Sequence, residues 1–345
     1  MKVVAGIDLG GTAINYTFMT AQNEFLIKEL CEYPALSKEG PDICLQQIAA
    51  GLEIALERAG LKRADIVYAG LDTPGPASAA GVLSARGSTN FVHPNWAGFD
   101  LPGGLSKKLG IPVVYQNDGN AGALWGHFSI FGAGEAKTSI TAIIGTGLAG
   151  GIIVNNDAIV GKNGFGAELG HVLIPFQSIQ SIKDTKPVCN CGRLGDLESI
   201  CSLTAIERTL LPHFLAKNPE HELNRSSGTE GVDMRKASRM VRGLAENGDA
   251  LCREIFRVQA HSLGLFLDQM INTFDPDAFI IGGGALETGP EFQKWFISEV
   301  RAGMPDQREE QVNIDIHIMP NGDTAGARGI AIEALKAAKA ANLLT

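Results

Sequence analysis

Three glycine-rich turns constrain the fold of this chain most, because each one directly follows a short apolar run. The turns span residues 8–12, 145–147 and 282–284. An apolar run that ends in a glycine turn is typical of a buried strand, and free backbone N–H groups in such a turn can approach phosphate oxygens. We therefore expect an α/β protein that keeps a ligand at its strand ends, although a plain hairpin or strand-to-helix turn would explain each turn alone.

Composition predicts a globular, enzyme-like chain. Glycine contributes 42 of 345 residues, well above its usual share of about 7%. Hydrophobic residues make up 45% and charged residues 19%, which excludes a disordered chain and a charged coiled coil. At about 100 to 200 residues per domain, the length predicts two domains. The glycine turns lack the spacing of the P-loop and of the dinucleotide-binding fingerprint, so neither motif applies.

Charge and cysteine content limit the partners and the compartment. The formal net charge is −9, and the lysines and arginines are scattered, so we expect no nucleic-acid partner. Six cysteines without an apolar leader segment predict reduced thiols in a cytoplasmic protein. Residues 138–156 carry no charge, but their central glycines and β-branched flanks predict two short strands rather than a membrane helix. We therefore expect no membrane partner.

Apolar spacing and turn residues predict alternating strands and helices along the whole chain. The predicted strands span residues 3–7, 14–19, 65–71, 111–115, 139–144, 151–154, 278–281 and 312–318. The predicted helices span residues 41–59, 101–109, 120–131, 197–216, 233–246, 249–273, 290–302 and 323–342. The hairpins around the first two glycine turns resemble each other, which suggests a duplicated architecture. We expect a small N-terminal α/β domain over 1–120 and a large C-terminal α/β domain over 121–345, with the C-terminal helix packing back on the small domain.

Five motifs follow one another in the order of a known family. They are Asp8-Leu9-Gly10-Gly11-Thr12, Asn117-Asp118-Gly119-Asn120-Ala121, Gly145-Thr146-Gly147, Glu168-Leu169-Gly170-His171 and the run from Cys189 to Glu198. Together they resemble the ROK family of bacterial sugar kinases, within the actin-like ATPase superfamily, from residue 3 to about residue 335. The resemblance implies a two-domain actin-like ATPase fold, of the ribonuclease H-like α/β class, with ATP and sugar in the cleft between the domains. It also implies Mg²⁺ and a homodimer.

Asp118 lies between a predicted strand and a predicted helix. On position alone it is either the N-cap of that helix or a general base, because a carboxylate at a strand end can reach a substrate hydroxyl. The resemblance implies that Asp118 takes the proton from the primary hydroxyl of a sugar, while Asn117 holds a ring hydroxyl. Phosphoryl transfer then depends mainly on positioning and charge neutralisation.

Glu168 and His171 lie three residues apart in a predicted turn, so both side chains can face one ligand. A solvated glutamate and a core histidine would explain the same pair. With Glu198, they resemble the family's sugar clamp, in which carboxylates accept hydroxyl protons and an imidazole bonds a hydroxyl near the anomeric carbon. Gly75 and Asn90 are further candidates for the sugar pocket.

The same resemblance implies ATP ligands in the glycine turns. The residues expected at the phosphates are Asp8, Gly10, Gly11, Thr12, Gly145, Thr146 and Gly147. The residues expected at the adenine or ribose are Gly282, Gly283 and Gly284.

Cys189, Cys191 and His171 offer ligands that suit a structural zinc site. The chain departs from the family pattern, because Asp196 stands where the family has a third cysteine and the segment between His171 and Cys189 is longer. Zinc accepts carboxylate oxygen, so Asp196 could be the fourth ligand, with Cys201 as a substitute if the loop folds differently. Loss of the zinc site is the alternative. A zinc-bound His171 would keep its other ring nitrogen for the sugar.

These observations predict an ATP-dependent hexose kinase that phosphorylates the 6-hydroxyl, most plausibly of glucose. A kinase for another acceptor, such as N-acetylmannosamine, fructose, allose or a C7-cyclitol, shares the same clamp residues. A sugar-sensing repressor of the same family would need a DNA-binding module, for which we expect no room before residue 3. A non-catalytic nucleotide-binding module is disfavoured by Asp118, Glu168, His171 and Glu198.

Overall fold

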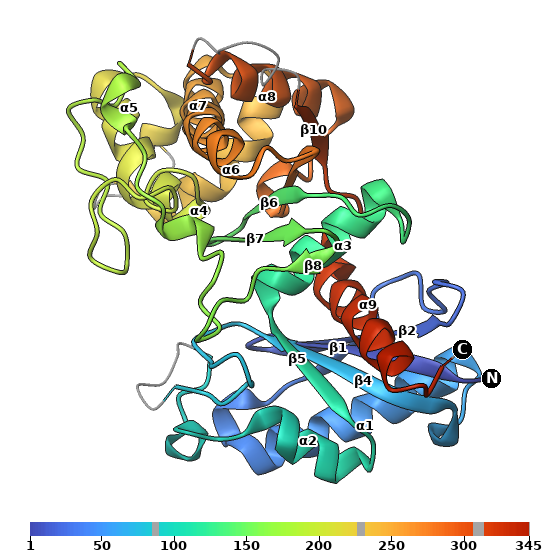
Figure 1. Cartoon of the computed structure of the whole chain (residues 1–345). Helices are drawn as coiled ribbons and strands as arrows, with labels where there is room; N and C mark the ends of the chain where they lie inside the picture. Colours follow the sequence, from blue (N-terminus) through green and yellow to red (C-terminus); the bar gives the residue numbers. More distant parts are fainter. Residues whose placement is uncertain (85–89, 226–231, 306–313, 345) are drawn as a thin grey trace. The chain divides into compact units, whose positions relative to one another are not determined.

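The computed structural model describes residues 1–84, 90–225, 232–305 and 314–344, which form two compact units (Figure 1). The first unit comprises Met1–Lys137, Gly151–Ala167 and Pro320–Thr345, and the second comprises Thr138–Gly150 and Glu168–Met319. Both units are discontinuous in sequence. The domain boundary expected near residue 120, with two continuous domains, stays a prediction.

The first sheet has the strand order β3-β2-β1-β4-β5. Its strands are β1 (Val3–Leu9), β2 (Ala13–Thr20), β3 (Glu32–Pro34), β4 (Ile66–Thr73) and β5 (Val113–Asn117). The predicted hairpin of β1 and β2 is antiparallel, β3 extends it, and β4 and β5 run parallel to β1. The carboxyl ends of β1, β4 and β5 therefore lie along one edge of the sheet.

The second sheet repeats this topology. Its order is β10-β9-β6-β7-β8, with β6 (Ser139–Ile144), β7 (Leu148–Val154), β8 (Asp157–Ala158), β9 (Ala278–Gly282) and β10 (Asp315–Ile318). As in the first sheet, a third strand extends the hairpin in antiparallel fashion, and two later strands continue the sheet in parallel. The duplicated architecture expected from the two hairpins is confirmed. Residues 312 and 313 of the predicted last strand lie outside the described residues.

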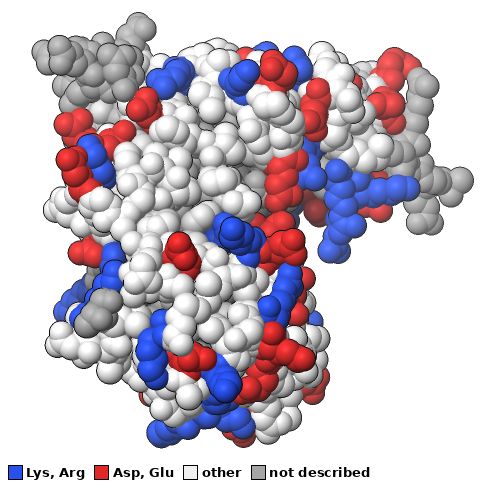
Figure 2. All heavy atoms as spheres, turned by 90° about the vertical axis from the view of Figure 1, so that its right-hand side faces the viewer, with Lys and Arg blue, Asp and Glu red and all other residues white. Residues whose placement is uncertain are grey.

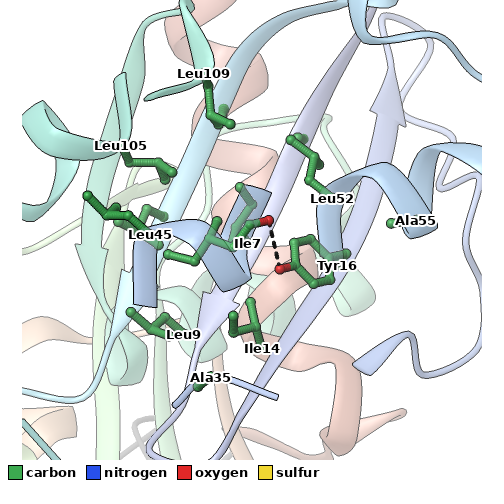
Figure 3. Close-up of a cluster of buried hydrophobic side chains, with 14 of the residues drawn as sticks. Ile7, Leu9, Ile14, Tyr16, Ala35, Leu45, Leu52, Ala55, Leu105 and Leu109 are labelled. Atoms are coloured by element: carbon green, nitrogen blue, oxygen red, sulfur yellow. Dashed lines mark hydrogen bonds between the residues drawn. The ribbon is translucent and has the colours of Figure 1, made fainter. Parts of the chain in front are cut away.

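One face of the first sheet is covered by α1 (Pro41–Ala59) and α2 (Leu101–Leu109), whose bounds match the predicted helices. Figure 3 shows Ile7 and Leu9 of β1 packing with Leu45 and Leu52 of α1. The Tyr16 hydroxyl of β2 donates a hydrogen bond of 3.0 Å to the carbonyl of Ile48 (Figure 3). Alternate residues of the strands therefore form a core with these two helices.

The opposite face of this sheet carries α9 (Ala325–Ala340), which also contacts α3 (Asp118–Phe131). Successive residues of a strand face opposite sides of the sheet, so Gly6 and Gly70 lie on the face that α9 covers. A Cβ on Gly6 would collide with the backbone of Ala327, and one on Gly70 would collide with the backbone of Ile330. Glycine at these positions lets the helix lie close to the sheet.

Helices make up most of the second unit after its hairpin. They are α4 (Leu203–Ala205), a π-helical segment (Ile206–Leu210), α5 (Leu211–Lys217), α6 (Met234–Glu246), α7 (Ala250–Phe274) and α8 (Pro290–Ala302). The predicted helix over 197–216 is wrong at its start, because helical structure begins only at Leu203. Residues 138–156 form β6, a turn and β7, as predicted. No helix within the described ranges is long and apolar enough to cross a membrane.

Candidate functional site

Three aspartates meet at the carboxyl edge of the first sheet. Asp8 and Asp72 are paired neighbours on β1 and β4, and Thr73 pairs with Asn117 of β5, directly before Asp118. Within the described residues, no lysine or arginine forms an ion pair with any of the three carboxylates. The edge is therefore strongly acidic and needs a compensating cation or protons.

Asp118 is the first residue of α3, and Asn117 is the N-cap of this helix. The Gly119 amide lies 2.9 Å from Asn117 Oδ1 and 2.7 Å from Asp118 Oδ1. Burial raises the pKa of Asp118, although hydrogen bonds from Gly119 and Asn117 act against this shift. The cap function that the sequence allowed for Asp118 thus belongs to Asn117.

Asp8 is the second carboxylate of this edge, and it is partly exposed. Its Oδ2 accepts a hydrogen bond of 3.4 Å from Asn15 Nδ2. Burial raises the pKa of Asp8 to about 6, with a smaller contribution from the negative charge of Asp118. Proton release from Asp8 therefore falls close to neutral pH.

Asp72 was not predicted from the sequence to be a functional residue. Its side chain is 0% exposed, and neither carboxylate oxygen has a hydrogen-bond partner among the described residues. Burial raises the pKa of Asp72 well above its ordinary value, and the charges of Asp8 and Asp118 add to the shift. A polar residue at the end of an apolar strand was the available signal, but we expected this strand to end at residue 71.

The turn between β1 and β2 holds Gly10, Gly11 and Thr12, as predicted. A Cβ on Gly11 would collide with the side chain of Asn90. The Ser37 hydroxyl lies 2.7 Å from the Gly11 carbonyl and 3.0 Å from the Asn90 carbonyl, so it ties the two loops together. The structure therefore brings Asn90 beside the first glycine turn.

Gly75 lies beside Asn117. A Cβ added to Gly75 would be 3.5 Å from Asn117 Nδ2, which is ordinary van der Waals contact. Gly75, Asn90, Asn117 and Asp118 all belong to the first unit. The candidate sugar residues of this unit thus cluster around its acidic edge and its glycine turn.

The two glycine turns of the second unit lie at neighbouring strand ends, because Ile143 of β6 pairs with Gly282 of β9. The Gly145 carbonyl accepts a hydrogen bond of 2.9 Å from the Leu203 amide, and Thr204 Oγ1 donates to the Thr146 carbonyl at 2.7 Å. Gly283 has a φ of 94°, and a Cβ there would collide with the backbone of Ile144. Glycine is required at this position, which keeps the two turns in contact.

The structure brings together His171, Cys189, Cys191 and Asp196, as the sequence predicted for a zinc site. Their ligand atoms all lie within 4.8 Å of one another. His171 Nδ1 is 3.1 Å from Asp196 Oδ2 and 3.7 Å from Cys189 Sγ, and Cys191 Sγ is 3.4 Å from Asp196 Oδ2. Tetrahedral zinc with bonds of about 2.0 to 2.3 Å separates its ligand atoms by about 3.3 to 3.8 Å. The donor set and its spacing therefore fit zinc.

Hydrogen bonds from neighbouring groups keep the buried Asp196 carboxylate ionised. Asp196 is 0% exposed. Burial alone would raise the pKa of Asp196, but hydrogen bonds from Cys189, His171 and the Ser199 amide hold that pKa below its ordinary value. Cys201 lies elsewhere, since its buried thiol points to the carbonyl of Gln259 at 3.7 Å. The substitute ligand considered from the sequence is thus not part of this cluster.

Glu198 connects the cysteine cluster to the second glycine turn. Its Oε1 lies 3.3 Å from Cys189 Sγ, and its Oε2 accepts a hydrogen bond of 2.9 Å from the Leu148 amide. His171 ends a short 3₁₀ helix (Leu169–His171) that directly follows the exposed Glu168. The three clamp residues predicted from the sequence therefore belong to one small region of the second unit.

Surface charge is mixed on the face drawn in Figure 2. Basic and acidic side chains are interspersed there. This face therefore offers no extended basic surface of the kind that binds a nucleic-acid backbone.

Comparisons with known proteins identify the family of this chain. The model of the ROK family matches residues 4–337. A glucokinase from Thermotoga maritima is 30% identical over 288 residues, which cover 82% of this chain and 82% of that protein. A xylose repressor from Caldicellulosiruptor bescii is 30% identical over 294 residues, which cover 84% of this chain and 67% of the repressor. The structure of a ROK family glucokinase from Streptomyces griseus, in complex with glucose and AMPPNP, aligns with a TM-score of 0.70 and 26% identity over 97% of this chain and 99% of that one.

Proposed function

Because the chain belongs to the ROK family, we propose that it is an ATP-dependent sugar kinase that phosphorylates the 6-hydroxyl of a hexose, with glucose as the best-supported acceptor. The single observation that carries the proposal is Asp118, a partly exposed carboxylate at the end of β5 that leaves helix capping to Asn117. The similarity to glucokinases supports glucose. The match to a xylose repressor leaves other sugars as alternatives to be tested.

Asp118 acts as the general base in this proposal. Its carboxylate accepts the proton of the 6-hydroxyl as that oxygen bonds to the γ-phosphorus of ATP, and the bond from this phosphorus to the bridging oxygen breaks to release ADP. A general base of this kind contributes a factor of about 10² to 10⁴ to the rate. The raised pKa of Asp118 makes it a stronger proton acceptor than an ordinary aspartate.

Sugar recognition is assigned to residues that surround the base or the cysteine cluster. They are Gly75, Asn90, Asn117, Glu168, His171 and Glu198. Carboxylate and amide groups that bond sugar hydroxyls reject analogues that lack those hydroxyls, because the partner group would be left unpaired. The Leu148 amide donates a hydrogen bond to Glu198 Oε2, which orients this carboxylate before a sugar binds.

Nucleotide binding is assigned to the glycine turns. We assign the phosphates to Asp8, Gly10, Gly11, Thr12, Gly145, Thr146 and Gly147, and the adenosine to Gly282, Gly283 and Gly284. Mg²⁺ bound with ATP would neutralise the charge that develops on the phosphates. Asp8 would hold that ion, since carboxylate oxygen is a ligand that Mg²⁺ prefers.

Zinc has a structural role in the proposal. His171, Cys189, Cys191 and Asp196 would hold it, and the ion would fix the loop that carries His171 and Glu198. His171 faces the cluster through Nδ1, which leaves Nε2 for a sugar hydroxyl. We also propose a homodimer, on the family resemblance alone.

The test is ADP release with MgATP over a panel of hexoses, aminosugars and cyclitols, with 6-deoxyglucose as the matched control for glucose. We expect turnover with glucose and none with 6-deoxyglucose, because the latter lacks the acceptor oxygen. Turnover with another member of the panel would change the assigned acceptor but would still support the proposed kinase activity. No turnover with any acceptor, in protein that binds ATP, would contradict the proposed function.

A further inference from the structure

Arg328, in helix α9, is a buried cation that lacks an anionic partner in the described part of the chain. Only 6% of its surface is exposed, and no aspartate or glutamate of the described ranges forms an ion pair with it. Burial lowers the pKa of its guanidinium, although arginine stays charged at physiological pH. A buried charge of this kind is costly unless another group compensates it.

Two aromatic rings and one carbonyl group hold the Arg328 guanidinium in place. Its Cζ lies 4.6 Å from the ring centre of Trp125 on α3 and 5.5 Å from that of Phe25. Its Nη2 donates a hydrogen bond of 2.7 Å to the Lys28 carbonyl, whereas Nε is buried without a partner and Nη1 bonds to no described residue. Stacking therefore fixes the orientation of the guanidinium, and part of its hydrogen-bonding capacity stays unused.

Arg328 lines an open groove of 730 Å³ on the first unit. The other residues that line the groove are Glu24, Phe25, Leu26, Lys28 and Asn321. Lys28 and Glu24 are exposed, and neither forms an ion pair within the described ranges. The groove thus combines two cations with an amide, an apolar wall and a single exposed carboxylate.

The groove is separate from the residues assigned to ATP and sugar. Gly326 of α9 faces Asp8, since a Cβ on this glycine would lie 2.7 Å from the Asp8 carboxylate. Arg328 follows two residues later, which turns it about 200° further round the helix axis. Phe25 pairs with Met19 near the end of β2, and this end lies beside the start of β1 rather than beside Asp8. An anion in the groove would therefore not occupy the catalytic edge of the sheet.

We propose that the groove around Arg328 is a binding site for a phosphate monoester, in addition to the ATP and sugar sites. A guanidinium presents a planar fork of donors that matches two phosphate oxygens. Lys28 adds a second positive charge, and a phosphate monoester carries about two negative charges at neutral pH. Asn321 offers an amide to a further oxygen, while Phe25 and Leu26 provide contact area for the organic part of the ligand.

This inference goes beyond the proposed kinase function and does not rest on it. In a purely structural alternative, Arg328 only anchors the segment of Phe25 and Lys28 to α9, through stacking and one hydrogen bond. That alternative predicts no saturable anion binding. Free inorganic phosphate is a second source of the same phosphoryl chemistry, and the choice of probes separates it from a monoester.

The experiment is calorimetric titration of phenyl phosphate, inorganic phosphate and benzoate into the full-length protein without sugar or nucleotide. We expect phenyl phosphate to bind most tightly, because it offers both the phosphoryl group and an apolar ring. Absence of saturable phenyl phosphate binding to the unmodified protein would overturn the inference, whatever the folding of any variant. Inorganic phosphate that binds as tightly would overturn the monoester, and benzoate that binds as tightly would overturn the phosphoryl group.

Two exposed residues of the groove test its charge with opposite signs. Lys28→Gln should weaken phenyl phosphate binding by about threefold, because it removes a positive charge from the groove. Glu24→Gln should strengthen that binding by a similar factor, because it removes the negative charge. Both side chains are exposed, so we expect both variants to fold. Affinities equal to that of the unmodified protein in both variants would overturn the inference.

Arg328→Lys keeps the charge but removes the planar fork, so phenyl phosphate should bind about tenfold more weakly or worse. Arg253→Lys is the matched control, because Arg253 also stacks on a tryptophan, Trp295 at 5.3 Å, but lies outside the groove. Its affinity should be unchanged. Binding that is lost in Gly11→Ala but complete in Arg328→Lys would place the anion at the first glycine turn and overturn the inference. Phenyl phosphate binding at Arg328 in a protein that phosphorylates no sugar would contradict only the proposed function.

Discussion

Asn117 is the N-cap of helix α3 and Asp118 is the first residue of that helix, so capping does not depend on the Asp118 side chain. The Gly119 amide is 2.9 Å from Asn117 Oδ1, which is sufficient to satisfy the start of the helix. Asp118 is therefore held in place by the helix without being required to cap it. This arrangement allows stability and catalysis to be separated by substitution.

Substitutions of Asn117 test that separation. Asn117→Ala should lower the free energy of unfolding by about 1 kcal/mol, because it removes the cap. Asn117→Ser should restore most of that stability, since serine is also a good N-cap. Both variants should raise the KM for sugar if Asn117 binds a ring hydroxyl. Denaturant unfolding and steady-state kinetics check the two effects separately, and a KM rise in Asn117→Ala alone would point to an indirect effect of the lost cap.

Asp118, the proposed general base, should become protonated at a higher pH than an ordinary aspartate, and the activity should fall with it. Burial raises the pKa of Asp118 above 3.8, and a base acts only when ionised, so kcat should fall with decreasing pH through that raised pKa. Asp8, Asp72 and Tyr115 are the titratable neighbours that interact with it. A pH–rate profile with saturating sugar and ATP measures this limb. An acid limb at or below the ordinary aspartate pKa would contradict the environment described for Asp118.

The raised pKa of Asp118 also affects the free energy of unfolding. A raised pKa in the folded state means that ionised Asp118 opposes folding above that pKa, and that this effect disappears as the pH falls below the unfolded value. Asp118→Asn should therefore be at least as stable as the unmodified protein at neutral pH. Its advantage should shrink on acidification, which thermal unfolding at several pH values measures. A destabilised Asp118→Asn at neutral pH would indicate a structural function of this carboxylate instead.

Zinc content should follow the four cluster residues. Cys191→Ser should lower both the zinc content and the unfolding temperature, because it removes one ligand of a closed site. Asp196→Cys should keep the zinc, since thiolate is a preferred zinc ligand. Cys201→Ser is the control, because its sulfur points to Gln259 and not to the cluster. The measurement is metal analysis of protein purified without chelator. Absence of zinc from the unmodified protein would contradict the zinc assignment.

Gly11→Ala should impair the use of ATP. Its new Cβ would collide with the Asn90 side chain, so the turn must shift, and kcat/KM for ATP should fall by about tenfold or more. Gly243→Ala is the matched control, because a Cβ at that position of α6 meets nothing within 4 Å. The control should be as active as the unmodified protein and slightly more stable. Equal kinetics in the two variants would exclude a function of the first turn in ATP use.

Local signals in the sequence identified most elements of the fold. Pro41 and Gly60 bound α1 as predicted, because proline suits the first helical turn and glycine ends a helix. Glycine turns also located both hairpins, whose similarity indicated the duplicated architecture. These features depend on neighbouring residues only, so the sequence alone was sufficient.

Long-range contacts explain what was missed. Residues 197–202 have an apolar pattern that favours a helix, yet the Leu197 amide donates to the Val172 carbonyl and the Glu198 amide to the Gly170 carbonyl. These bonds fix the segment beside the His171 loop until Ser202 caps α4. Asp72 was missed for a similar reason, because β4 continues to Thr73 through pairing with β5. The four candidate zinc ligands His171, Cys189, Cys191 and Asp196 were predicted from the sequence, but only the fold shows that Cys201 lies apart from them.

The most direct test of the proposed activity compares Asp118→Asn with the unmodified protein in one assay. ADP formation from MgATP and saturating glucose gives kcat, and calorimetry gives the glucose affinity of each protein. Asp100→Asn, an exposed cap of α2 that asparagine can replace, is the control. We predict unchanged glucose affinity and a kcat lowered by about 10² or more for Asp118→Asn alone. Full turnover in Asp118→Asn would contradict the assignment of the general base.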